Sequence, residues 1–200
     1  MKVDLIADRC AIYQFWSRWL TDSNPPAALV LDGGHPVKYF NSTASNRYRY
    51  ALKNGYTAVE ISWSKRNEYL NDIHAVNNSV PIRQGREMKD SYKEYPSQSS
   101  EADQCQAHYA TFIGAFKDGH LVGYISTNFC GQLAASSQII GHGDHLKNGV
   151  MLVLWAEFVR ICQERGMAMI VYSRWSDGKD GLRYWKHSVG MRQTSIQEKT

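Results

Sequence analysis

One segment near the C-terminus constrains the fold more than any other. Residues 148–165 carry apolar side chains around most of a helical surface, with Glu157, Arg160 and Glu164 forming a single polar stripe at helical spacing. Gly166 then suits the position just after a helix C-terminus, and residues 167–172 read Met-Ala-Met-Ile-Val-Tyr. The pattern predicts a long, largely buried helix followed by a strand from the interior of a sheet.

The residues before this helix predict antiparallel strands. Runs of alternating and β-branched residues at 109–116 and 121–126 flank Asp118-Gly119, a dipeptide typical of a tight hairpin turn. We expect a third strand within residues 134–140, a last helix over 181–188, and a final strand from Val189. The second half is therefore predicted as hairpin, strand, long helix, apolar strand and short helix.

The first half gives weaker signals. Its patterns predict strands at 3–7, 27–31 and 57–62, and helices at 8–20, 45–54 and from Ser64 to Val76. Residues 95–103 are polar and rich in turn formers, which is typical of a loop rather than a domain boundary. With no internal repeat, the chain is expected to form one domain over residues 1–200.

The composition is that of an ordinary folded domain, with 43% apolar and 21% charged residues. The N-terminus lacks the apolar core of a signal peptide, and no segment has the roughly 18 apolar residues of a membrane span. We therefore expect a cytoplasmic protein with no membrane partner. The net charge of +4 permits a tRNA or DNA partner without requiring one. The cysteines show no metal or redox spacing and are expected to be reduced and mostly buried: Cys10, Cys105, Cys130 and Cys162.

The order of elements in the second half resembles the GNAT superfamily of acyltransferases. Residues 182–190, Leu-Arg-Tyr-Trp-Lys-His-Ser-Val-Gly, are similar to the L-x-x-F-K-x-x-x-G ending of its FemABX-like aminoacyltransferases. Residues 47–56 also resemble a helix that precedes a strand in that branch. The resemblance implies an α/β (α+β) fold: a single GNAT-like domain with a mixed, mostly antiparallel twisted sheet flanked by helices on both faces. It also implies an acceptor-side half at about 1–100 and a donor-side half at about 108–194.

The resemblance also implies a chemistry. Members of the superfamily transfer an acyl group from acyl-CoA, usually acetyl-CoA, or an aminoacyl group from aminoacyl-tRNA, to an amine. We therefore expect an N-acyltransferase with no tightly bound cofactor and with one of these two donors as co-substrate. Two alternatives stay open. One is a phage-type transferase that modifies nucleic-acid bases, and the other is a non-catalytic binding module on a GNAT scaffold.

Residues 138–143 are the main candidate for donor binding. Gln138, Gly141 and Gly143 match the spacing of the loop with which CoA-using members bind pyrophosphate through backbone amides at a helix N-terminus. Asp144 departs from that pattern, because a carboxylate beside a pyrophosphate is unfavourable. The segment therefore favours donor binding but does not identify CoA.

The same loop supplies three candidate catalytic residues. His142, Asp144 and His145 are predicted to lie at the acyl-transfer centre, where a histidine of near-neutral pKa accepts the proton of an attacking ammonium. They are also competent metal ligands. No further cluster with zinc-like spacing accompanies them in the sequence, so no metal site is predicted.

The remaining candidates come from three other segments. Tyr172, at the end of the apolar strand, lies where the superfamily often places a general acid for the leaving group. Lys186 is assigned to donor binding by the family pattern. Arg83, Gln84 and Arg86 suit a phosphate or carboxylate on the acceptor or on tRNA, because two guanidinium groups flank a loop-like Gln-Gly.

Overall fold

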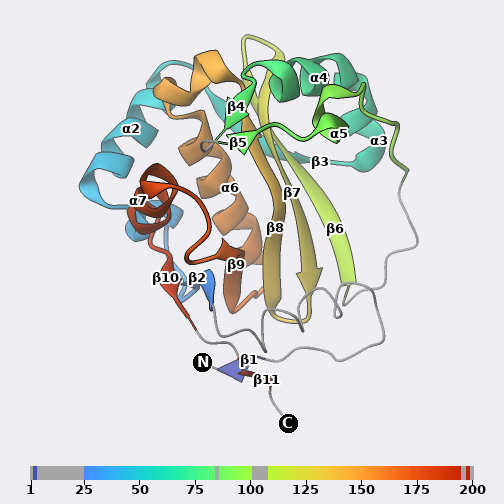
Figure 1. The fold of residues 1–200 in the computed structure, drawn as a ribbon. Coiled ribbons are helices and arrows are strands. Elements are labelled where there is room, and N and C mark those ends of the chain that lie inside the picture. The colour runs from blue at the N-terminus through green and yellow to red at the C-terminus, as the bar shows by residue number, and fades with distance from the viewer. Residues whose placement is uncertain (1, 4–24, 84–85, 101–107, 195–196, 199–200) are drawn as a thin grey trace.

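A twisted seven-stranded sheet organises the protein (Figure 1). The structure is a computed structural model and describes residues 2–3, 25–83, 86–100, 108–194 and 197–198. Within this sheet all neighbouring strands are antiparallel except β8 and β9, which run parallel. In spatial order the strands are β10 (Arg192–Gln193), β2 (Pro26–Val30), β9 (Met169–Arg174), β8 (Leu133–Gly141), β7 (His120–Cys130), β6 (His108–Lys117) and β3 (Thr57–Ile61). Two small pairs lie outside this sheet: β1 (Lys2–Val3) with β11 (Gln197–Glu198), and β4 (Ile82–Arg83) with β5 (Arg86–Glu87).

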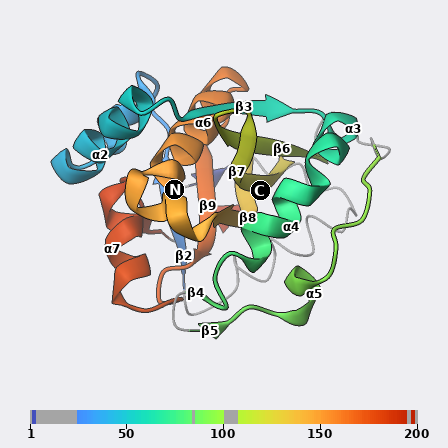
Figure 2. The same ribbon diagram turned by 90° about the horizontal axis from the view of Figure 1, so that it is seen from above.

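Helices cover both faces of the sheet, and Figure 2 shows α6 and α4 on opposite sides of the strands. The helices are α2 (Ser42–Lys53), α3 (Trp63–Arg66), α4 (Leu70–Asn78), α5 (Asp90–Lys93), α6 (Val150–Glu164) and α7 (Asp180–Ser188). Short 3-10 helices are η1 (Pro36–Tyr39), η2 (Asn67–Tyr69) and η3 (Gly143–Asn148). This arrangement confirms the predicted fold class. In the part of the chain that the structure describes, no helix is long and apolar enough to cross a membrane.

The long helix α6 is the centre of the core, as its sequence predicts. Trp155 and Phe158 are fully buried and pack with Ile113 and Ile125 of the central hairpin. The polar stripe stays outside the core, where Arg160 pairs with Glu157 and Glu164. The opposite face of the sheet has its own apolar cluster, built from α4 and residues such as Phe112, Tyr124 and Ile140. The layered core follows from the apolar periodicity of α6 and the alternation of β6 and β7.

Several predicted elements differ from the structure. The helix expected from Ser64 to Val76 is wrong in its start and continuity, because Ser62 caps α3 by accepting a hydrogen bond from the Lys65 amide at 3.1 Å, and η2 separates α3 from α4. The helix expected at 45–54 begins earlier, where the Asn41 side chain accepts from the Ala44 amide at 2.8 Å. Residues 4–24 and 101–107 lie outside the described residues, and so do the helix predicted at 8–20 and two of the cysteines. Cys130 and Cys162 are buried, as expected.

The two parallel strands separate soon after they pair. Register runs from Leu133 opposite Met169 to Ala135 opposite Val171, and the ladder ends there. On its other edge β8 carries a bulge at Ser137, since Ser126 lies opposite Gln138 while Thr127 lies opposite Ser136. The bulge bends β8, and a fork opens between β8 and β9.

Gly149 sets the entry into α6 and gives the first testable prediction. It has a left-handed φ of 88°, and a Cβ there would lie 2.9 Å from the Arg47 carbonyl oxygen. Gly119, in the hairpin turn, has a φ of 85° but open space around the same Cβ position. We expect Gly119→Ala to lower the free energy of unfolding by about 1–2 kcal/mol and Gly149→Ala by about 2–5 kcal/mol, measured by urea unfolding. Equal losses for the two variants would show that the Arg47 backbone moves away from the new Cβ without destabilising the protein.

Candidate functional site

The fork between β8 and β9 contains a cavity of about 450 Å³, which we call the fork cleft. Its walls come from β8, β9, the helices α6 and α7, η3 and residues 80–83 around β4. Most of the lining side chains are aliphatic or aromatic. The lining residues are Val80, Ile82, Arg83, Ile139, Gly141, Leu146, Met151, Tyr172, Lys179, Gly181, Leu182 and Trp185. A cavity of this size and character is typical of a small-molecule site.

A second cavity of about 240 Å³ adjoins the fork cleft. The two share four lining residues, Leu146, Met151, Gly181 and Trp185. The second cavity then extends past Gly149 at the start of α6 to Arg47 and Tyr184, so we call it the α2–α7 cavity. Together the two cavities form a groove that leads from the fork to the N-terminus of α6.

The backbone amides of the predicted phosphate loop already have partners inside the protein. The His142 amide donates to the Val122 carbonyl at 2.8 Å, and the Gly143 amide donates to Ser79 Oγ at 2.9 Å. The next two amides donate within the loop. The Asp144 amide donates to His142 Nδ1 at 3.3 Å, and the His145 amide donates to the His142 carbonyl at 3.0 Å. A pyrophosphate at this loop would have to displace these bonds.

The two predicted loop glycines have a packing role. A Cβ on Gly143 would lie 2.7 Å from Val80 Cγ1, and one on Gly141 would lie 2.8 Å from Met151 Sδ. A Cβ at either position would therefore require neighbouring side chains to shift. Of the predicted donor-binding loop residues, only Gly141 lines the fork cleft, since the Gln138 amide donates to Tyr92 Oη at 3.3 Å on the side of α5.

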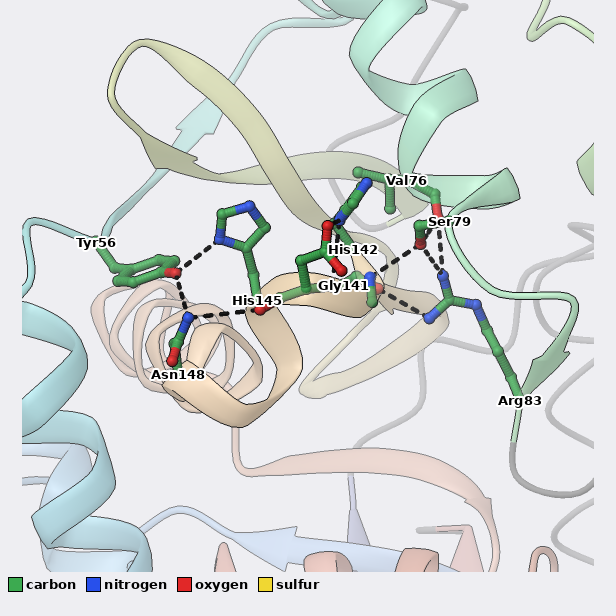
Figure 3. A network of polar contacts seen from close by, with 10 residues as sticks. Tyr56, Val76, Ser79, Arg83, Gly141, His142, His145 and Asn148 are labelled. Atoms are coloured by element: carbon green, nitrogen blue, oxygen red, sulfur yellow. Dashed lines mark hydrogen bonds and ion pairs between the residues drawn. The ribbon is translucent and has the colours of Figure 1, made fainter.

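Arg83 clamps two elements together at the mouth of the fork cleft (Figure 3). Its Nη1 donates to the Gly141 carbonyl at 2.8 Å, and its Nη2 donates to the Val76 carbonyl at 2.7 Å and to Ser79 Oγ at 2.9 Å. These bonds join the end of α4 to the end of β8, and burial lowers the pKa of the guanidinium. Nε is buried without a partner. Gln84 lies outside the described residues, and Arg86 is described only by its backbone in β5.

The predicted catalytic residues of the loop turn away from both cavities. Figure 3 shows His145 pointing to Tyr56, with 2.6 Å between His145 Nδ1 and the tyrosine hydroxyl. The His142 ring lies edge-on to His145 with centroids 5.5 Å apart, and Asp144 is exposed. None of these three side chains lines the fork cleft or the α2–α7 cavity. Among the described residues, no group of three His, Cys, Asp or Glu side chains could hold a metal ion.

The environment of His145 predicts a pH-dependent stability. Burial, followed by the nearby His142, lowers the pKa of His145 below the roughly 6.5 of an unfolded chain. The unfolded state therefore binds more protons, so stability is complete above about pH 6.5 and is lost as the pH falls from there through the folded-state pKa. Urea unfolding between pH 8 and pH 5 should show a smaller loss for His145→Gln than for the wild type. Parallel curves would contradict this assignment.

Tyr172 lines the fork cleft, and Lys186 is buried beside it. The Tyr172 ring packs edge-on against Trp185 with centroids 5.6 Å apart. Lys186 is fully buried, and its ammonium donates to the carbonyls of Arg174 at 2.5 Å and Asp177 at 3.0 Å. Burial lowers the pKa of Lys186 to about 8. The lysine thus ties the segment after β9 to α7, with its Nζ 5.8 Å from the centroid of the Tyr172 ring.

The apolar lining is the part of the site that sequence reasoning missed. Ile139, Met151 and Trp185 look like ordinary core positions, because each sits in a strand or helix with a buried face. An indirect signal comes from exposure, since Ile82 and Tyr184 beside the two cavities are 60% and 58% exposed. Large apolar side chains that stay exposed near a cavity often mark a binding site.

Comparison with known proteins agrees with this fold. The sequence matches no protein-family model and no curated protein sequence. Among solved structures, FemX superposes with a TM-score of 0.61 at 10% identity, covering 91% of this chain and 65% of FemX. The chain has the GNAT fold. The C-terminal domain of a protein named as a lysylphosphatidylglycerol synthetase, from Agrobacterium fabrum, gives 0.53 at 12% identity, covering 82% of this chain and 56% of that one.

A tandem GNAT protein from the clavulanic acid biosynthesis pathway is similar to nearly the whole chain. Its TM-score is 0.53 at 18% identity, over 95% of this chain and 58% of its own length. The chain therefore spans between 56% and 65% of the length of these three structures. The structural similarity to FemX agrees with the FemABX-like sequence motif at residues 182–190.

Proposed function

We propose that the protein is an N-acyltransferase that moves an aminoacyl group from an aminoacyl-tRNA to an amine, and that the reaction takes place in the fork cleft. The observation that supports this best is the cleft itself, which opens where β8 and β9 separate after Ala135 and Val171. Backbone groups of β8 beyond that point have no β9 partner in the sheet ladder. A strand edge of this kind can hold a reacting carbonyl in a fixed orientation.

The donor is assigned from the loop between β8 and α6. A CoA thioester carries a pyrophosphate, yet the amides of residues 142–145 already donate to acceptors within the protein. An aminoacyl ester at the end of a tRNA needs no pyrophosphate cradle. The α2–α7 cavity, with Arg47 at its wall and the exposed Tyr184 ring, suits the terminal nucleotide through charge and stacking.

The reaction forms one bond, breaks another and requires two proton transfers. The amine nitrogen attacks the ester carbonyl, the C–N bond forms, and the C–O bond to the ribose breaks. The attacking nitrogen loses a proton and the ribose oxygen gains one. We assign the second transfer to Tyr172, because it lies in the cleft wall and beside the Lys186 ammonium. Water in the open cleft accepts the first proton, from the attacking nitrogen, because His145 points to Tyr56 and does not line the cleft.

A thermal-shift comparison tests the donor class. Leucyl-tRNA at 100 times its dissociation constant should stabilise the protein by about 2.7 kcal/mol. Acetyl-CoA and CoA at the same concentration should give no shift. Uncharged tRNA is the matched control and should give a smaller response, since it lacks the group that enters the fork cleft. A shift with acetyl-CoA and none with leucyl-tRNA would contradict the proposal.

A further inference from the structure

The walls of the fork cleft carry information about the group that is transferred. Four apolar side chains meet there from three elements: Ile139 from β8, Met151 from α6, and Leu182 and Trp185 from α7. Tyr172 adds an aromatic face from β9. We infer that the transferred aminoacyl group carries a large apolar side chain, of the size of leucine or phenylalanine. The inference rests on the proposed function and names its substrate class.

The charged groups at the cleft offer no counter-charge for a basic side chain. The Arg83 guanidinium is held by two carbonyls and a hydroxyl of the protein itself. Lys179 is the other charged side chain among the described lining residues, and no carboxylate is among them. A basic side chain would therefore enter without a counter-charge, and desolvation of its charge would weaken binding.

The volume of the cleft argues against a small side chain. A methyl group can contact only a small part of the apolar lining of a cavity of about 450 Å³. An alanyl or glycyl group would leave much of the apolar wall in contact with water. A leucyl or phenylalanyl group removes that surface from water, and Met151 can adapt its flexible thioether to either shape.

Calorimetric titration with stable donor analogues tests this inference. The probes are 3′-aminoacylamino-3′-deoxyadenosines that carry leucyl, phenylalanyl, alanyl or lysyl groups. Leucine has three more carbons than alanine, so the leucyl analogue should bind about 50-fold more tightly, at the ~0.8 kcal/mol that each buried methylene contributes. The phenylalanyl analogue should bind similarly to leucyl, and the lysyl analogue no better than alanyl.

A matched pair of variants locates the preference. Leu182→Ser should reduce the ratio of leucyl to alanyl affinity by about 5- to 20-fold, because it removes apolar wall from the rim of the cleft. Val59→Ser changes an apolar residue that is 47% exposed on the edge strand β3, and it should leave the ratio unchanged. A ratio that Leu182→Ser leaves intact would overturn the placement of the side chain in the fork cleft.

The possible failures are distinguishable. Equal affinity for the alanyl and leucyl analogues would overturn the inference about the side chain and leave the proposed donor class standing. Binding of none of the four analogues would overturn the donor class, and the inference with it.

Discussion

Ile139→Glu is expected to reduce aminoacyl transfer by at least about 100-fold while the protein stays folded. Ile139 is half-buried on β8 and faces the fork cleft, so the new carboxylate would lie among Met151, Tyr172 and Trp185. Because the Arg83 guanidinium already donates to three protein oxygens, a carboxylate that the substrate separates from water here costs about 3–5 kcal/mol. In the empty cleft water solvates the carboxylate, so the free energy of unfolding should fall only by about 1–2 kcal/mol, from the apolar contact that Ile139 makes with the core.

Consumption of labelled leucyl-tRNA in the presence of a panel of amines, followed by mass spectrometry, measures this effect. Val59→Glu is the matched control, because it adds the same charge to an exposed apolar position on β3, far along the sheet from the fork. Wild-type rates in Ile139→Glu would show that transfer takes place elsewhere.

Arg83→Met should lower the free energy of unfolding by about 2–4 kcal/mol. The substitution keeps much of the side-chain length but leaves the carbonyls of Gly141 and Val76 and the hydroxyl of Ser79 without their donor. Hydrogen bonds from a charged donor each contribute about 1.5–3 kcal/mol, and water recovers part of that at this half-buried site. Urea unfolding measures the loss. Lys89→Met is the control, because it also replaces a cation by methionine but at an exposed position.

The same variant separates two roles for Arg83. As a clamp, it acts through the geometry of β8, so its loss should appear first in stability. As a ligand for a phosphate or carboxylate, the role that the sequence predicts, its loss should weaken binding of leucyl-tRNA and leave unfolding unchanged. The second result would contradict the clamp.

The elements of the second half were predictable because each depends on local chemistry. Residues close together in the sequence determine the periodicity of α6, the Asp118-Gly119 turn and the apolar run of β9. The start of α3 was not predictable in the same way, because two nearby serines, Ser62 and Ser64, are equally good caps in sequence and the structure uses the first. Tertiary context decides between them.

The site was harder to predict because its contacts are long-range. The glycine spacing at 141 and 143 is the same for a phosphate loop and for close packing, and only the positions of Met151 and Val80 distinguish the two. Arg83 and Lys186 both bind backbone carbonyls of segments that sequence patterns cannot place beside them. The fork depends on a bulge at Ser137, whose register no local motif indicates.

A structure of the protein bound to 3′-leucylamino-3′-deoxyadenosine tests the central claim most directly. The leucyl side chain should lie between Ile139 and Trp185, with the carbonyl beside the β8 edge within reach of Tyr172, and the adenosine in the α2–α7 cavity. A leucyl group bound instead against Tyr56 and His145, on the other side of η3, would contradict the account and return the chemistry to the loop histidines.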